Sequence, residues 1–127
     1  MGEGSTITIT YDSITFDRFG DISKESLKAI IDAKCRSYED AEDLIKLIGK
    51  LWFYPDAFRG GDGKYAISTG GLGSNEELFC ALDRNYTFRV WAKCVCFPDG
   101  HRLYAVNDEA RNELRRLSWD IVQKWGG

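Results

Sequence analysis

The sequence predicts an α+β fold in which helices pack against one face of a mainly antiparallel sheet. Short runs of β-branched and aromatic residues alternate with period two, which is typical of half-buried strands. Other segments repeat apolar residues at helical spacing. Two of the strands flank a tight turn at residues 98–101, which favours an antiparallel pair. The expected order is β-β-α-α-β-α-β-β-α, in a single domain over residues 1–127.

The first half of the chain predicts a hairpin followed by two helices. Residues 6–10 alternate threonine with isoleucine and predict a strand, and residues 14–16 predict its return. Ser23 and Ser37 are suited to cap helices, because their hydroxyls can accept from backbone amides. The apolar residues of the first helix are Leu27, Ile30 and Ile31. Those of the second are Ala41, Leu44, Ile45, Ile48, Leu51 and Trp52.

The second half predicts a loop, three strands and two helices. The glycines at 60, 61 and 63 indicate a loop, and residues 65–69 a strand. Ser74 and Glu77 have the spacing of a capping box, so a helix with Leu78, Phe79 and Leu82 on its apolar face is expected to start at Ser74. Residues 86–97 predict the longest strand, and residues 102–106 its antiparallel partner. Asn107 is expected to cap a final helix that reaches about residue 125.

The predicted long strand has one face that mixes aromatic residues with cations. If Phe97 pairs with Arg102, Val95 lies opposite Tyr104. The mixed face consists of Thr87, Arg89, Trp91, Lys93, Val95 and Phe97. It could bind a protein or a single-stranded nucleic acid by stacking and charge, or another element could cover it while the cations reach water.

The composition limits the possible functions. With 17 basic and 20 acidic residues the net charge is −3, which argues mildly against broad binding to a phosphate backbone. No apolar run is long enough to suggest a leader or a membrane span. The cysteines are too few and too unevenly spaced for a disulfide scaffold, so a reduced, cytoplasmic protein is expected. They are Cys35, Cys80, Cys94 and Cys96.

No metal, cofactor or catalytic residue is expected. Cys94 and Cys96 share one face of the predicted strand and are expected to be small buried apolar residues. His101 is the sole histidine, and its place in a turn supplies neither a nucleophile nor an orienting acid.

The most distinctive segment runs from a strand through glycines into an acidic helix start. Its candidate ligand residues are Gly70, Gly71, Gly73, Asn75, Glu76 and Glu77. Such a junction can cradle phosphate, but no lysine follows the glycines. A phosphate about 6 Å from one of the glutamates would be repelled by about 3 kcal/mol at an effective dielectric near 20. A tight structural turn is therefore favoured, with contact to a partner or a small ligand as the alternative.

The predicted final helix has two different sides. Its apolar stripe consists of Ala110, Leu114, Leu117, Ile121 and Trp125. The opposite side carries Arg115, Arg116 and Trp119, a composition typical of binding hot spots.

Parts of residues 64–105 resemble a group of small uncharacterised proteins from bacteriophages and other mobile elements. The similar features are Ser68-Thr69-Gly70-Gly71 before Asn75-Glu76-Glu77, the segment around Trp91, and Gly100-His101 with Tyr104 nearby. Leu72 stands where the group's S-T-G-G-W-S-x-N-E-E pattern has tryptophan. The resemblance implies a mobile-element origin and no particular activity.

The expected function is that of a non-enzymatic, protein-binding factor, for example an anti-CRISPR-like inhibitor of a host defence system. The candidate partner-binding residues are Arg89, Trp91, Lys93, Tyr104, Arg115, Arg116 and Trp119. The alternatives are a single-stranded nucleic-acid binder that uses the mixed strand face, and a small-ligand or phosphate-binding enzyme at residues 70–77.

Overall fold

The architecture is α+β, as the sequence predicts. The structure is a computed structural model and describes residues 7, 9–98, 100–116 and 120. Over these residues the helices are α1 (Lys24–Asp32), α2 (Tyr38–Leu51), α3 (Gly73–Arg84), α4 (Tyr86–Trp91) and α5 (Asp108–Arg115). The strands are β1 (Phe58–Gly61), β2 (Lys64–Ser68), β3 (Lys93–Cys96) and β4 (His101–Ala105). Short 3₁₀ helices cover Tyr11–Ser13 and Pro55–Ala57.

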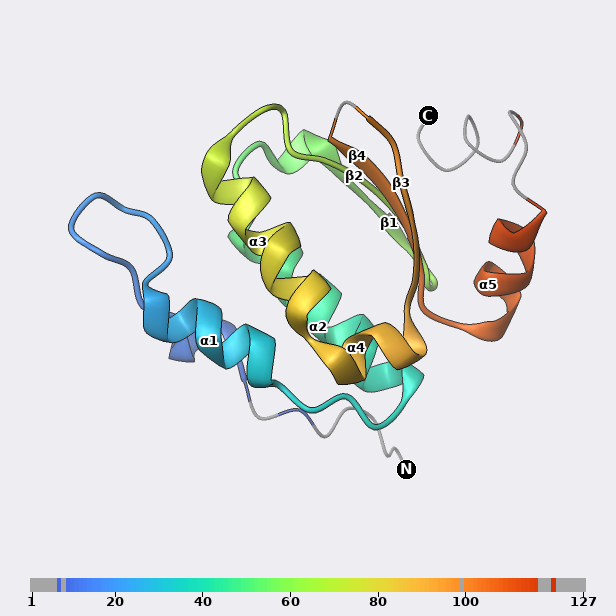
Figure 1. Ribbon diagram of the computed structural model, residues 1–127, viewed down its shortest axis with the longest axis horizontal. Helices are drawn as coiled ribbons and strands as arrows, with labels where there is room; N and C mark the ends of the chain where they lie inside the picture. The colour runs from blue at the N-terminus through green and yellow to red at the C-terminus, as the bar shows by residue number, and fades with distance from the viewer. Residues whose placement is uncertain (1–6, 8, 99, 117–119, 121–127) are drawn as a thin grey trace.

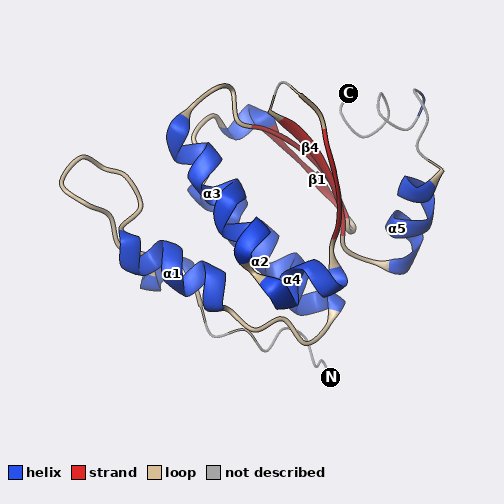
Figure 2. Cartoon of the chain, in the orientation of Figure 1, coloured by secondary structure: helices blue, strands red, loops and turns tan. Residues whose placement is uncertain are grey.

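The strands form one antiparallel sheet in the order β1-β2-β4-β3, with helices on both faces. In Figures 1 and 2, α2 and α3 lie on one side of the sheet and α5 lies on the other. The expectation that helices pack on one face alone is therefore wrong. Side chains alternate between the two faces along each strand. Tyr104 joins the core beneath α2 and α3, whereas Leu103 and Ala105 pack against Ala110 and Leu114 of α5.

Three helix starts confirm the capping predictions. The side chains of Ser23, Ser37 and Asn107 each accept a hydrogen bond from the backbone N–H three residues farther on. The expected capping box at Ser74 is wrong, because α3 begins at Gly73 and no side chain caps it. Ser74 therefore lies inside the first turn of the helix.

The predicted N-terminal hairpin is also wrong. Over the described part of 6–16 the regular structure is the 3₁₀ helix Tyr11–Ser13, and Phe16 makes only an isolated bridge to Ile22. The Ser13 hydroxyl accepts from the Thr10 amide at 3.1 Å and donates to the Thr10 carbonyl at 2.7 Å, which closes a local turn. The amide of Thr15 donates to the Ser26 hydroxyl at 2.7 Å in place of a strand partner.

The predicted long strand 86–97 is two elements, the helix α4 and the strand β3. Asn85 explains the difference, because its buried side chain accepts from the Phe88 amide at 2.9 Å and so caps α4. The Asn85 side-chain amide also donates to the carbonyls of Ile30 at 2.7 Å and Ala33 at 2.9 Å, at the end of α1. This cap outweighs the strand propensity of the residues that follow it.

The hairpin of β3 and β4 exists, but its register differs by one residue from the expected one. Cys96 pairs with Arg102, and Val95 pairs with Leu103 and not with Tyr104. A shift of one residue moves a side chain to the other face of a strand. Val95 and Phe97 consequently pack against the core beneath α5, so this part of the face is covered.

The strand β1 was expected to be a loop because of its glycines. It pairs with β2 through a turn at Asp62 and Gly63, whose φ angles are 55° and 82°. Positive φ at both positions is what a two-residue hairpin turn of the primed type requires.

Replacing Asn85 by alanine should lower the free energy of unfolding by about 3 kcal/mol, because buried carbonyls and the Phe88 amide lose their partner. Urea denaturation measures this change. Asn112→Ala is the control, since Asn112 is exposed, and it should change stability by less than about 0.5 kcal/mol. Equal effects of the two substitutions would contradict the assigned role of Asn85.

Candidate functional site

The glycine turn is held together by its own polar groups. Gly70 and Gly71 have φ angles of 62° and 77°, which favour glycine. The amide of Gly71 donates to the Thr69 hydroxyl at 3.2 Å, and the amide of Leu72 donates to the Thr69 carbonyl at 3.2 Å. The amide of Gly70 reaches the Ser68 hydroxyl at 3.3 Å. These amides are therefore engaged within the turn itself.

Asn75, a candidate ligand residue, joins two backbone segments through its side chain. Its side chain is fully buried, at 0% exposure. It accepts from the Phe53 amide at 2.9 Å and donates to the carbonyls of Phe53 at 2.7 Å and Thr69 at 3.2 Å. Glu76 and Glu77 are exposed next to it, and Gly73 begins α3. This arrangement is that of a structural turn.

The residues of the expected aromatic and basic strand face do not lie on one strand. Arg89 is exposed on α4, whereas Lys93 lies on β3. Trp91 is half-buried, and its indole N–H donates to the Cys35 carbonyl at 3.1 Å. Tyr104 is buried, with its ring centroid 5.9 Å from that of Phe88. Burial raises the pKa of Tyr104 well above its ordinary value.

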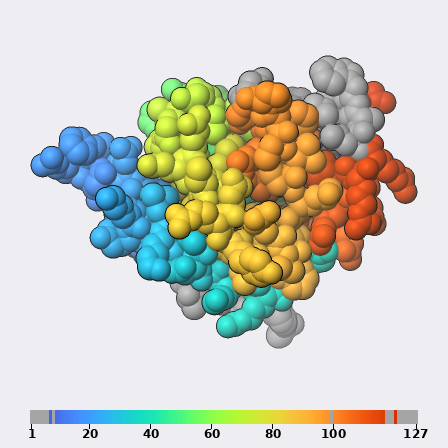
Figure 3. All heavy atoms as spheres, viewed as in Figure 1, coloured from blue at the N-terminus to red at the C-terminus, as the bar shows by residue number. Residues whose placement is uncertain are grey.

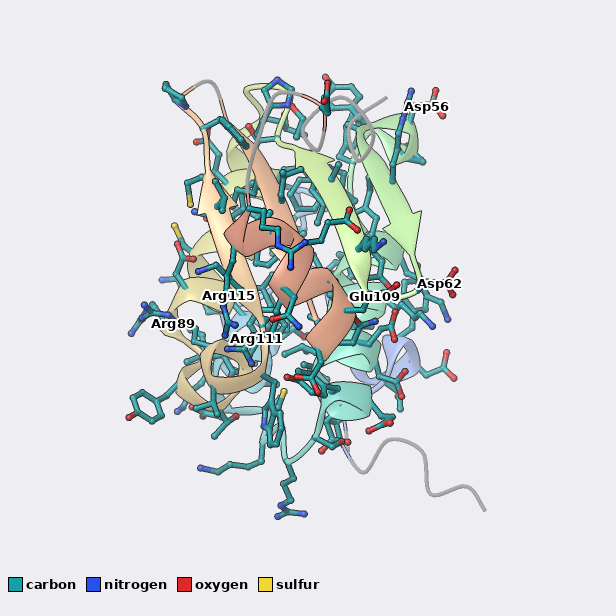
Figure 4. The ribbon with its side chains drawn as sticks, turned by 90° about the vertical axis from the view of Figure 1, so that its right-hand side faces the viewer. Asp56, Asp62, Arg89, Glu109, Arg111 and Arg115 are labelled. Atoms are coloured by element: carbon teal, nitrogen blue, oxygen red, sulfur yellow. The ribbon has the colours of Figure 1, made fainter. Side chains whose placement is uncertain are left out.

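The helix α5 ends at Arg115, whereas the sequence predicts a helix that reaches about residue 125. Ala110 and Leu114 are buried, as its predicted apolar stripe requires, whereas Leu117, Ile121 and Trp125 lie outside the described residues. Figure 4 shows α5 crossing the sheet and labels Arg111 and Arg115 on it. Arg115 is exposed and donates to the Asn112 side-chain carbonyl at 3.0 Å, and Arg116 is exposed at the end of the helix. Trp119 lies outside the described residues, so the binding hot spot that it would form with Arg115 and Arg116 stays a prediction.

A loop that the sequence did not predict carries Phe19, the most exposed phenylalanine of the described residues. Residues 15–22, named here the docking loop, project from the body of the molecule near α1 (Figures 1 and 3). Phe16 is 50% exposed and Phe19 is 74% exposed. The guanidinium carbon of Arg18 lies 4.8 Å from the centroid of the Phe19 ring.

Asp17 organises the docking loop from within. Its carboxylate accepts from the amides of Phe19 at 2.9 Å and Asp21 at 3.1 Å. Its backbone carbonyl accepts from the Gly20 amide at 3.1 Å, and its own amide donates to the Asp21 carbonyl at 2.7 Å. Gly20 has a φ of 84°. An aspartate followed by glycine three positions later is typical of a turn, and this signal could have identified the loop from the sequence.

A polar cluster joins α3 to β4, an internal strand of the sheet. Arg102 binds both carboxylate oxygens of Asp83, at 2.7 and 3.0 Å, and lies 4.2 Å above the Phe79 ring. It also donates to the Tyr104 hydroxyl at 3.0 Å. Hydrogen bonding to Asp83 raises the pKa of Arg102 despite partial burial, so its charge is permanent. This pair ties β4 to α3 and offers no acid–base chemistry.

Cys35 and Cys94 are not poised as nucleophiles. Burial raises the pKa of Cys94 to about 12, with the neighbouring Cys96 as the next cause. Burial likewise raises the pKa of Cys35 to about 11, with the charge of Asp40 adding to it. These two thiols stay protonated at neutral pH, and the thiolate is the reactive form. The expectation that Cys96 is buried is wrong, because its side chain is exposed.

Comparison with known proteins gives no match to any family model, curated protein or solved structure. Within the described part of the chain, none of the helices has the length and apolar character needed to cross a bilayer.

The rate of alkylation by iodoacetamide should differ between the buried and the exposed thiols. Because burial raises the pKa of Cys94 to about 12, only about one Cys94 thiol in ten thousand is ionised at pH 8, so Cys94 should react long after the exposed Cys80. Its rate should rise about tenfold per pH unit up to pH 11, because the thiolate fraction rises likewise. Peptide mapping by mass spectrometry measures both rates. Equal rates for Cys80 and Cys94 at pH 8 would contradict the raised pKa.

Proposed function

We propose that this chain is a small, non-enzymatic protein-binding factor that contacts its partner through the docking loop. The observation that carries the proposal is the exposure of Phe19, at 74%, on a loop whose backbone is bonded internally by Asp17. An aromatic residue that lies largely in water can contribute roughly 2–3 kcal/mol of binding when a partner buries it.

The internal hydrogen bonds of the docking loop favour binding without a large entropy loss. Besides the bonds of Asp17, the Ser23 amide donates to the Thr15 carbonyl at 3.0 Å, which closes the base of the loop. A loop that already holds its bound shape loses less conformational entropy on association than a flexible one. The loop is therefore suited to insert its phenylalanines into a preformed pocket.

The chemistry of the loop indicates the kind of partner surface. Phe16 and Phe19 would be buried in an apolar pocket of the partner. The Arg18 guanidinium beside the Phe19 ring would pair with a carboxylate at the rim of that pocket. Asp17 is occupied by backbone amides and contributes less to recognition.

Encoding by a phage or another mobile element, inhibition of a host defence system, and action in the cytoplasm of the host cell are the finer parts of the proposal. The mobile-element origin rests on the resemblance at Ser68–Gly71 and Asn75–Glu77, and the cytoplasmic location rests on the small number and uneven spacing of the cysteines. Inhibition of a host defence system is one form that protein binding by such a factor would take.

The two alternatives have less support from the arrangement of the residues. The first alternative places a nucleic-acid interface on one strand face, but Arg89, Trp91 and Lys93 belong to different elements or are half-buried. The second alternative places a phosphate site at the glycine turn, but Thr69 and Ser68 accept from the turn amides.

The experiment compares the intact chain with Phe19→Ala and a matched control. Tyr86→Ala is the control, because Tyr86 is 79% exposed on α4 and lies outside the docking loop. Each immobilised protein is incubated with host lysate, and the partner that the intact chain retains in stoichiometric amount is then titrated against all three. Phe19→Ala should weaken binding by about thirtyfold, or about 2 kcal/mol, while Tyr86→Ala retains it.

Circular dichroism and thermal unfolding should show Phe19→Ala to be as stable as the intact chain within about 0.5 kcal/mol. Unchanged partner binding by Phe19→Ala would overturn the role of the docking loop. Failure to retain any protein, together with tight, salt-sensitive binding of a single-stranded oligonucleotide, would overturn the function.

A further inference from the structure

Two thiols lie side by side on β3, at one edge of the sheet, and the docking function does not use them. The sulfur atoms of Cys94 and Cys96 are 3.7 Å apart. Residues two apart on a strand project to the same face, so both side chains lie on the face that carries Arg102 and Tyr104. Cys96 is exposed and Cys94 is half-buried, which leaves the pair accessible from solvent.

The backbone spacing at this pair disfavours a direct disulfide bond. A strand advances about 3.4 Å per residue, so the two β-carbons are roughly 6.8 Å apart. A disulfide needs β-carbons about 3.8 Å apart and sulfur atoms about 2.05 Å apart. Bond formation would require the strand to bend and break its pairing with β4. The sulfurs nevertheless converge to 3.7 Å, much closer than the backbone positions that carry them.

The same separation matches the distance that a tetrahedral metal ion imposes on two thiolates. Zinc–sulfur bonds are about 2.3 Å long, so sulfurs 3.7 Å apart around one zinc ion subtend about 107°, close to the tetrahedral angle. The strand can therefore hold such an ion between the two sulfurs without a change of its backbone.

We propose that Cys94 and Cys96 chelate a soft divalent cation of the zinc type. Thiolate ligands select such ions over magnesium or calcium. Over the described residues, no group of three or more histidine, cysteine and acidic side chains could hold a metal. The described residues thus supply two of the four ligands, and the other two positions are taken by water or by a further side chain.

The surroundings are electrostatically compatible with the ion. Arg102 is the cation next to the pair in the sheet register, and both oxygens of Asp83 neutralise it, at 2.7 and 3.0 Å. The ion displaces the protons of both thiols, which pass to water, and the two resulting thiolates balance its two positive charges. The loaded site therefore adds no net charge to the edge of the sheet. A divalent ion bound there therefore meets no uncompensated positive charge from Arg102.

Cadmium is the probe, because it binds thiolates as zinc does and each sulfur–cadmium bond absorbs in the near ultraviolet. The full chain, reduced with a phosphine that does not bind as a thiol, is titrated with cadmium alone and then with zinc as competitor. Cys96→Ser is the main variant, since Cys96 is exposed and its loss spares the core. Cys80→Ser is the matched control, because Cys80 is an exposed cysteine on α3.

The intact chain and Cys80→Ser should bind one cadmium ion per chain with the absorption of two thiolate ligands, and zinc should displace it. Cys96→Ser should bind about a hundredfold more weakly and lose half of the absorption, because one of two ligands is gone. Cys94→Ser should do the same if circular dichroism shows it to be folded. Absence of the absorption in the intact chain would overturn the proposal, as would equal affinity in Cys96→Ser or loss of binding in Cys80→Ser.

Discussion

The position of α3 depends on two buried asparagines, one near each of its ends. Asn75 in its first turn is 0% exposed and Asn85 just after its last residue is 1% exposed. Neither side chain faces water, so each must find all of its hydrogen bonds within the protein. Asn75 bonds to the backbone of the loop that follows α2, and Asn85 bonds to the end of α1 and the start of α4. Because these partners are distant in sequence, the two side chains join segments that hydrophobic packing alone would orient less uniquely.

The hydrogen bonds of these two asparagines explain why the glycine turn is structural and why the docking loop is anchored. The glycine turn has the composition of a ligand site. The Asn75 side chain nevertheless bonds to the carbonyls of Phe53 and Thr69 within the protein, at the end of the sheet. At the other end, Asn85 holds Ile30 and Ala33 of α1, and the docking loop leads directly into this helix. The exposed phenylalanines of the loop are thus carried by an anchored element, as rigid recognition of a partner requires.

Local signals predicted the parts of the fold that local interactions determine. The hydroxyls of Ser23 and Ser37 bond to amides three residues away, so the sequence alone indicated where α1 and α2 begin. The strand character of residues 86–97 was misleading, because the competing interaction comes from Asn85 and its partner carbonyls more than fifty residues earlier. For the candidate site, the turn nature of Gly70 was predictable, but the burial of Trp91 was not, since its indole bonds to the distant Cys35 carbonyl.

The amide of Phe53 offers the most direct test of the role of Asn75. It donates to the Asn75 side chain at 2.9 Å, although Phe53 itself is 58% exposed. Native-state hydrogen exchange measures the free energy needed to open that bond. If Asn75 holds the end of α3, the Phe53 amide should exchange only through global unfolding, as slowly as the amide of Leu82 in the buried part of α3. Exchange at the rate of a solvent-exposed loop amide would contradict this, and would return the glycine turn to consideration as a ligand site.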